Sequence, residues 1–139
     1  MEHENCELCS SVGGELIASS DLLRVVRVHD EKYPAFCRVI LNRHVTEMTH
    51  LSSDERYQLM DAVFVVERTM LDVLNPRKIN LASFGNMVSH LHWHVIPRFE
   101  DDPHFPNPIW GEQLRDSQRL VPAEFWGLLE KNISAQLNR

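Results

Sequence analysis

Three histidines alternate with apolar residues in the segment Ser-His-Leu-His-Trp-His-Val-Ile-Pro-Arg, residues 89–98. Successive side chains of a β-strand point to opposite faces of the sheet, so a strand places all three imidazoles in one row. The histidines are His90, His92 and His94. The apolar residues between them, which can enter a core, are Leu91, Trp93 and Val95. A helix would scatter the histidines around its axis, and the β-branched and aromatic residues also favour a strand.

A row of three imidazoles has three interpretations: a solvated face, a metal site, or a nucleophilic histidine flanked by two that orient it and handle protons. A strand rises about 3.3 Å per residue, so the backbones of His90 and His94 stand roughly 13 Å apart. One ion is therefore poorly placed to bind all three side chains. The strict alternation in turn argues against a solvated face.

The composition predicts one domain, residues 1–139, with enough apolar content (43%) for a core. The net charge of −6 and the lack of a long basic run argue against a nucleic-acid partner. A local pocket can still be electropositive and bind a small anionic nucleotide. No apolar run is long enough to span a bilayer, and the acidic start, residues 1–5, does not resemble a signal peptide. We therefore expect a cytoplasmic protein without a membrane partner, its three cysteines reduced.

The first helix is expected to begin after Ser52, which has the spacing of a capping box with Glu55, and to end before Asn75-Pro76. Its apolar stripe is predicted to be core and consists of Tyr57, Met60, Val63, Phe64, Leu71 and Leu74. A second helix is expected over residues 122–137, with one side formed by Phe125, Leu128, Leu129 and Ile133.

Five strands are expected, over residues 15–19, 21–29, 36–41, 78–83 and 89–99. The proline-rich stretch 100–111 is expected to be a loop, because its prolines prevent regular structure throughout. Strands adjacent in sequence and interrupted by one long helix predict an α+β fold. Its sheet is an antiparallel meander with that helix packed on one face.

Cys6 and Cys9 form a C-x-x-C pair near the start of the chain. In a reduced compartment such a pair is half of a zinc site, a redox pair, or two ordinary cysteines. The βαβ surroundings expected of a redox pair are missing from the sequence. A zinc site would need two further ligands from elsewhere in the fold.

The sequence His-Leu-His-Trp-His-Val-Ile resembles the signature of the histidine triad (HIT) family of nucleotide hydrolases and transferases. In that signature three histidines alternate with hydrophobic residues and two more hydrophobics follow. The flanks extend the resemblance over about residues 6–110, with residues 100–139 forming a C-terminal loop and helix. The resemblance implies the family's α+β fold, a homodimer and no organic cofactor.

The same resemblance implies roles for individual residues. His92 matches the nucleophile that forms a nucleotidyl-histidine intermediate. His94 matches the third triad histidine, which contacts phosphate or a backbone carbonyl and helps to fix the nucleophile's tautomer, and His90 matches the first, a structural contact or a zinc ligand. The candidate nucleotide-binding residues, each of which could instead be a turn or edge residue, are Asn80, Asn86 and Asp30. The implied ligands of a structural zinc ion are Cys6, Cys9, His44 and His90.

We therefore expect an enzyme that cleaves a phosphoanhydride or phosphoramidate bond at the α-phosphate of an adenosine nucleotide. Its substrate would be a diadenosine or other dinucleoside polyphosphate, or a nucleoside phosphoramidate, and the sequence does not choose between them. The alternative is a nucleotide-binding, zinc-stabilised interaction protein with little or no turnover. The intact triad favours catalysis, because binding alone does not need an aligned nucleophile.

Overall fold

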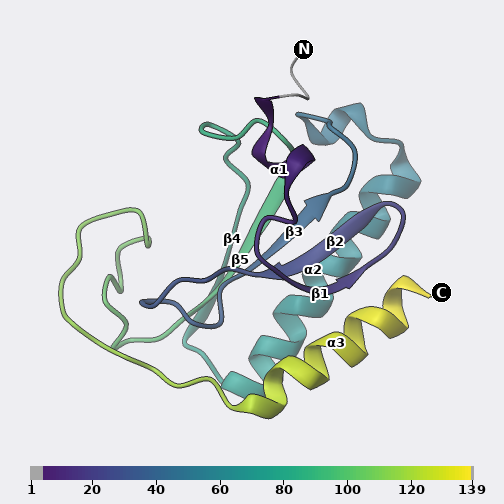
Figure 1. Cartoon of the computed structure of the whole chain (residues 1–139). Helices are drawn as coiled ribbons and strands as arrows, with labels where there is room; N and C mark the ends of the chain where they lie inside the picture. The colour runs from purple at the N-terminus through teal and green to yellow at the C-terminus, as the bar shows by residue number, and fades with distance from the viewer. Residues whose placement is uncertain (1–4, 139) are drawn as a thin grey trace.

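The computed structural model describes residues 5–138 and shows a five-stranded antiparallel sheet with two long helices on one face (Figure 1). The strands are β1 (Glu15–Ser19), β2 (Leu23–Arg27), β3 (Cys37–Leu41), β4 (Lys78–Ala82) and β5 (His92–Arg98). The helices are α1 (Glu7–Ser10), the 3₁₀ turn η2 (Met48–His50), α2 (Ser53–Leu74) and α3 (Ala123–Leu137). The predicted α+β fold is confirmed.

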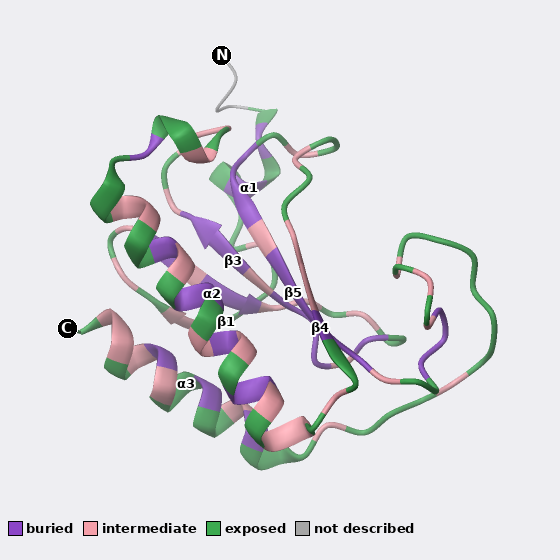
Figure 2. Ribbon diagram, turned by 180° about the vertical axis from the view of Figure 1, so that it is seen from behind, coloured by how far each residue is buried: buried purple, intermediate pink, exposed green. Residues whose placement is uncertain are grey.

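The strand order β1-β2-β3-β5-β4 departs from chain order at one point. The strand that follows α2 in the chain, β4, lies at the edge, and β5 pairs with both β3 and β4. The triad strand is therefore interior, and Figure 2 shows β3 and β5 largely buried. An interior strand holds its side chains more firmly than an edge strand, because ladder hydrogen bonds fix it on both sides.

The triad strand begins at His92, later than expected. The carbonyl of Leu41, which a continued ladder would use, bonds instead to the His90 imidazole. The backbone N–H of Leu91 turns away to the carbonyl of Val45. The predicted second strand is likewise shorter and spans only Leu23–Arg27.

The helix α2 begins with the predicted capping box, in which Ser52 and Glu55 each bond to the other's backbone N–H. It ends at Asn75, whose φ of 49° is left-handed. Its buried face packs on the sheet through Leu59, Ala62, Val63, Val66 and Met70. The same core receives the apolar residues of the triad segment, as predicted: Leu91, Trp93 and Val95.

Part of the predicted helical core was wrong. Tyr57 and Phe64 are 72% and 49% exposed, because the buried stripe runs through Leu59, Val63 and Val66 and leaves them on a neighbouring face of the helix. On α3, Leu128 is exposed while the other members of its predicted side are buried: Phe125, Leu129 and Ile133.

The stretch between β5 and α3 is irregular, as predicted for residues 100–111, and its inner part is buried. Arg98 reaches into it and bonds to both carboxylate oxygens of Asp102 (2.8 and 3.1 Å). The Asp102 carboxylate also accepts hydrogen bonds from the backbone N–H groups of Phe99, His104 and Phe105. A buried ion pair therefore fixes the loop to the end of the triad strand.

No helix among residues 5–138 combines the length and the hydropathy that crossing a membrane requires. Residues 1–4, which form most of the acidic start, lie outside the described residues.

Candidate active site

The imidazoles of His92 and His94 line one open cavity of about 370 Å³ on the sheet face opposite α2. The cavity also receives Arg38 from β3, which pairs with His94 in the ladder. Its outer wall contains Phe84 and Trp110, whose rings meet edge to face at 4.7 Å. The strands thus present two imidazoles and a guanidinium to a space large enough for a small ligand.

The tautomer of His92 is set by the backbone. Its Nδ1 lies 2.7 Å from the carbonyl oxygen of His90, and a carbonyl can only accept, so Nδ1 carries the proton and donates. The Nε2 atom therefore keeps its lone pair. The carbonyl of His90 supplies this hydrogen bond, and the predicted help of His94 in fixing the tautomer stays a prediction.

His94 is surrounded by rings. The centroids of His92, Trp110 and Phe36 lie 4.9, 5.3 and 5.4 Å from its own. Burial, and then the charges of His92 and Arg38, lower the pKa of His94 to about 4. Burial is also the main cause that lowers the pKa of His92. Both lowered pKa values favour the neutral imidazole before a ligand binds.

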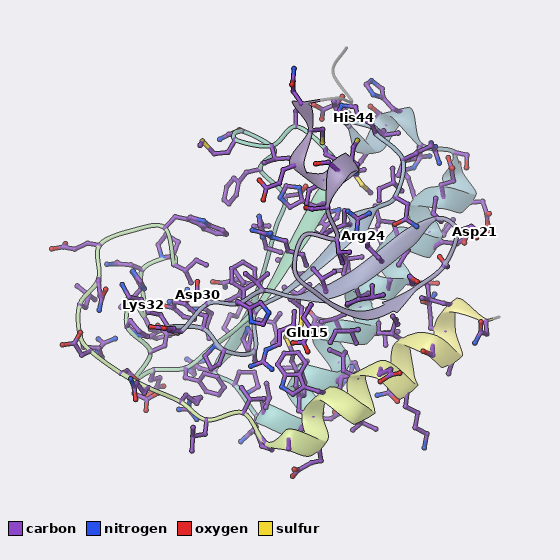
Figure 3. The ribbon with its side chains drawn as sticks, viewed as in Figure 1. Glu15, Asp21, Arg24, Asp30, Lys32 and His44 are labelled. Atoms are coloured by element: carbon purple, nitrogen blue, oxygen red, sulfur yellow. The ribbon has the colours of Figure 1, made fainter. Side chains whose placement is uncertain are left out.

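His90 points away from the cavity to a separate cluster. Its Nδ1 lies 3.4 Å from the sulfurs of both Cys6 and Cys9, and the Cys9 sulfur lies 3.4 Å from Nδ1 of His44. The four ligand atoms all lie within 4.8 Å of one another. The predicted set is therefore brought together, close enough to hold a metal ion. Figure 3 shows His44 beside the N-terminal segment.

The spacing of this cluster fits a tetrahedral site. Zinc–sulfur bonds of about 2.3 Å and zinc–nitrogen bonds of about 2.0 Å at tetrahedral angles put sulfur and nitrogen about 3.5 Å apart. The observed separations of 3.4 Å are close to that value. The Nε2 of His90 donates to the carbonyl of Leu41. That bond leaves the Nδ1 lone pair facing the two sulfurs, the arrangement that metal-bound histidines adopt.

Arg24 holds the cysteine-bearing segment against the sheet (Figure 3). Its guanidinium donates to the carbonyls of Leu8 (2.7 Å), Ser11 (3.1 Å) and Val12 (2.9 Å). Burial and the neighbouring Cys6 raise the pKa of Cys9, and the positive charge of Arg24 only partly offsets that rise. The segment is thus anchored through its backbone as well as by the cluster.

The three predicted nucleotide-binding residues lie in different surroundings. Asn86 is exposed and lines the same cavity as His92. The side-chain oxygen of Asn80 accepts from Arg98 at 2.8 Å. Asp30 caps a turn, accepting from the N–H groups of residues 32 and 33, and lies near Lys32 in Figure 3. Only Asn86 is placed at the cavity, and a nucleotide role for any of the three stays a prediction.

Three residues that line the cavity were not predicted from the sequence: Arg38, Phe84 and Trp110. Arg38 had a usable signal, since it is the one charged residue in the otherwise apolar segment Cys-Arg-Val-Ile-Leu. Phe84 and Trp110 come from two loops, and nothing in the sequence brings those loops together.

The family model of the HIT domain matches residues 12–101. Two AP-4-A phosphorylases, from two strains of Mycobacterium tuberculosis, are each 30% identical to the chain over 103 residues. The match covers 66% of this chain and 53% of theirs, so the chain spans about half the length of these relatives.

Solved structures share the fold over nearly the whole chain. A histidine triad protein from Bradyrhizobium japonicum is 24% identical, with a TM-score of 0.69 and coverage of 91% of this chain and 92% of the other. A histidine triad protein from Sinorhizobium meliloti is 26% identical, with a TM-score of 0.68 and 91% of each chain covered.

Proposed function

The chain belongs to the HIT domain family, and from that premise we propose that it is a nucleotide hydrolase or transferase acting through His92. It cleaves a phosphoanhydride or phosphoramidate bond at the α-phosphate of an adenosine nucleotide. The name of the AP-4-A phosphorylase relatives supports a nucleotide substrate. The leaving group is a nucleoside polyphosphate or an amine.

In the first step, Nε2 of His92 attacks the α-phosphorus and forms a nitrogen–phosphorus bond. The bond from phosphorus to the leaving group breaks, and the leaving group departs with the electron pair and takes up a proton. In the second step, water attacks the same phosphorus and releases the nucleoside monophosphate. The second step breaks the nitrogen–phosphorus bond and regenerates the imidazole.

The observation that carries this proposal is the bond from His92 Nδ1 to the carbonyl of His90, at 2.7 Å. A nucleophilic imidazole needs one nitrogen protonated and held while the other keeps its lone pair. The bond supplies that state before substrate arrives. The adjacent cavity, which His92 and His94 both line, supplies the space for a phosphate.

A trapping experiment tests the proposal. The protein is mixed with substrates labelled at the α-phosphate, diadenosine tetraphosphate and adenosine phosphoramidate among them, and quenched within milliseconds. We expect an acid-labile label bound to the protein. We also expect a burst of leaving group whose molar amount equals that of the enzyme. A panel of adenosine and guanosine substrates then identifies the leaving group and the base.

The alternative, a nucleotide-binding interaction protein stabilised by zinc, is supported by the complete Cys6, Cys9, His44 and His90 cluster. The same experiment separates the two functions. Nucleotide binding with neither label nor burst on any substrate would support the alternative and remove the catalytic proposal.

We propose that a structural zinc ion is bound by the metal cluster, the side chains of Cys6, Cys9, His44 and His90. Zinc prefers four tetrahedral cysteine and histidine ligands, and a site with four protein ligands leaves no open position for substrate. Replacing Cys9 with serine should remove the metal and lower the melting temperature, because a structural zinc contributes folding free energy. Metal analysis of untagged protein, with melting curves before and after chelation, makes the measurement. Cys37→Ser is the control for metal content and for the response to chelation, since Cys37 is buried in the core outside the cluster.

Zinc below about a tenth of an equivalent, with a melting temperature unchanged by chelation, would contradict the zinc proposal, because structural zinc normally adds to stability.

We also propose that the chain forms a homodimer through α2. Tyr57 and Phe64 are exposed on that helix and line a hollow with Met60. Exposed aromatic residues at helical spacing are typical of interfaces. The neighbouring strand β4 is an edge strand within the described sheet.

Sedimentation should give twice the chain mass of 16.2 kDa for the wild type. The double variant Tyr57→Glu/Phe64→Glu should sediment as a monomer, because it places charges in the apolar contact. Leu120→Glu, in an exposed loop, is the control and should stay dimeric. A monomeric wild type would remove the dimer proposal.

A further inference from the structure

Arg38 is the cation of the active-site cavity. It lies on β3 opposite His94, so both side chains lie on the same face of the sheet. Of the described residues that line the cavity, Arg38 is the only one with a permanent charge, and no carboxylate lines it. An acidic chain, of net charge −6, thus places a positive charge without an accompanying carboxylate in this cavity.

The guanidinium of Arg38 is only partly used by the protein. It has five N–H donors, and one of them bonds to the carbonyl of Gly13 at 3.2 Å. Its Nε is buried and has no hydrogen-bond partner among residues 5–138. No ion pair joins the guanidinium to an acid among the described residues. Burial lowers the pKa of Arg38, and the charge of Glu7 offsets part of that effect. A half-buried cation with unused donors is costly unless something anionic completes it.

The second buried polar atom without a partner at this place is Nδ1 of His94. The two atoms belong to paired residues on neighbouring strands. Arg38 Nε and His94 Nδ1 thus both lack a hydrogen-bond partner among residues 5–138, and both residues line the cavity. A phosphate has several acceptor oxygens and matches the planar fork of an arginine.

We propose that Arg38 binds the phosphate of the nucleotide substrate beside His92. The inference rests on the proposed function for the position of the nucleotide, and adds to it the residue that recognises its negative charge. The charge of Arg38 neutralises part of the charge on the phosphate that His92 attacks.

Binding measurements test the role without turnover. Calorimetry compares adenosine with adenosine monophosphate on the wild type, on Arg38→Gln and on Arg38→Lys. A charge-assisted contact should make the monophosphate bind at least about tenfold more tightly than adenosine to the wild type. In Arg38→Gln this preference should fall to within about threefold, while the glutamine amide can still donate to Gly13. Arg38→Lys should recover part of it, because lysine keeps the charge and loses the fork.

Arg27→Met is the matched control. Arg27 lies on the neighbouring strand β2 but on the opposite face, with its guanidinium 4.4 Å from the ring centroid of Trp126. The Arg27→Met substitution removes one positive charge, as Arg38→Gln does, from a residue that does not line the cavity. The preference for the monophosphate should therefore stay at the wild-type value.

Each outcome decides between explanations. An unchanged preference in Arg38→Gln, or a wild type that binds the monophosphate no better than adenosine, would overturn the role of Arg38. An Arg38→Gln variant that does not fold would also overturn it, by showing that Arg38 serves the fold. Arg38-dependent binding without any trapped intermediate would instead leave this inference standing and remove the proposed catalytic function.

Discussion

Replacement of His92 by glycine should lower kcat by at least about 10⁴-fold, because removal of a nucleophile forces the reaction onto a direct attack by water. The fold should persist. The His92 side chain contributes one hydrogen bond, to the carbonyl of His90, and does not belong to the core beneath α2. Single-turnover kinetics with the substrate identified by trapping, together with circular dichroism, make the measurement.

Chemical rescue sharpens this prediction. The glycine variant leaves a hole of imidazole size next to the cavity, so added imidazole should restore part of the rate. His50→Ala is the control, since His50 is exposed and lies in η2, away from the cavity. Turnover of His92→Gly within about tenfold of the wild type would refute the assignment of the nucleophile.

Replacement of Asp102 by alanine should destabilise the protein by about 3–5 kcal/mol, because it leaves the Arg98 guanidinium buried and uncompensated. Arg98 is 2% exposed and Asp102 is 5% exposed. The carboxylate also accepts from the Tyr33 hydroxyl at 3.1 Å, so several donors lose their partner at once. The loss is a large part of a typical stability of about 5–15 kcal/mol. Thermal and urea unfolding measure it.

The adjacent acid is the control for this change. Asp101 pairs with Arg119 at 2.8 Å, but its side chain is 69% exposed. Asp101→Ala should therefore cost at most about 1 kcal/mol. Equal effects of the two substitutions would show that the buried network around Asp102 is not what fixes the loop.

The same carboxylate should make stability depend on acid. Burial alone would raise the pKa of Asp102, but hydrogen bonds from Arg98 and from the N–H groups of Phe99 and Phe105 lower it from 3.8 to about 2. A lowered pKa stabilises the fold above the unfolded value, on the order of 2 kcal/mol. This contribution is lost as the pH falls from 4 toward 2. The Asp102→Asn variant lacks it, so its stability should fall less than that of the wild type over this range.

The sequence was sufficient wherever a short pattern determines a local structure. Alternation around His92 determined the strand and the face that enters the core. The spacing of Ser52 and Glu55 determined the start of α2. The C-x-x-C spacing marked Cys6 and Cys9 as possible metal ligands, and the resemblance to the HIT family implied the two distant members, His44 and His90.

What could not be predicted depends on distances between segments. A helical stripe specifies a period but not which of two neighbouring faces is buried, and Tyr57 and Phe64 were therefore misplaced. Arg38 acquires its surroundings from the register between β3 and β5, which no local pattern encodes. The edge position of β4 depends on β5 pairing between β3 and β4, and no local pattern in the sequence specifies that order. The bond from Arg98 to the side-chain oxygen of Asn80 is likewise a contact between distant segments that no local pattern predicts, and the nucleotide role of Asn80 stays a prediction.

His90 uses three atoms in three directions: Nδ1 toward the cysteines, Nε2 toward Leu41, and its carbonyl toward His92. The proposed zinc site and the proposed nucleophile therefore share one residue. A preparation that is only partly loaded would hold two populations with differently held nucleophiles, and its kcat would be their average. Rates should therefore be normalised to metal per chain, and a His90 variant cannot serve as a clean probe of either centre.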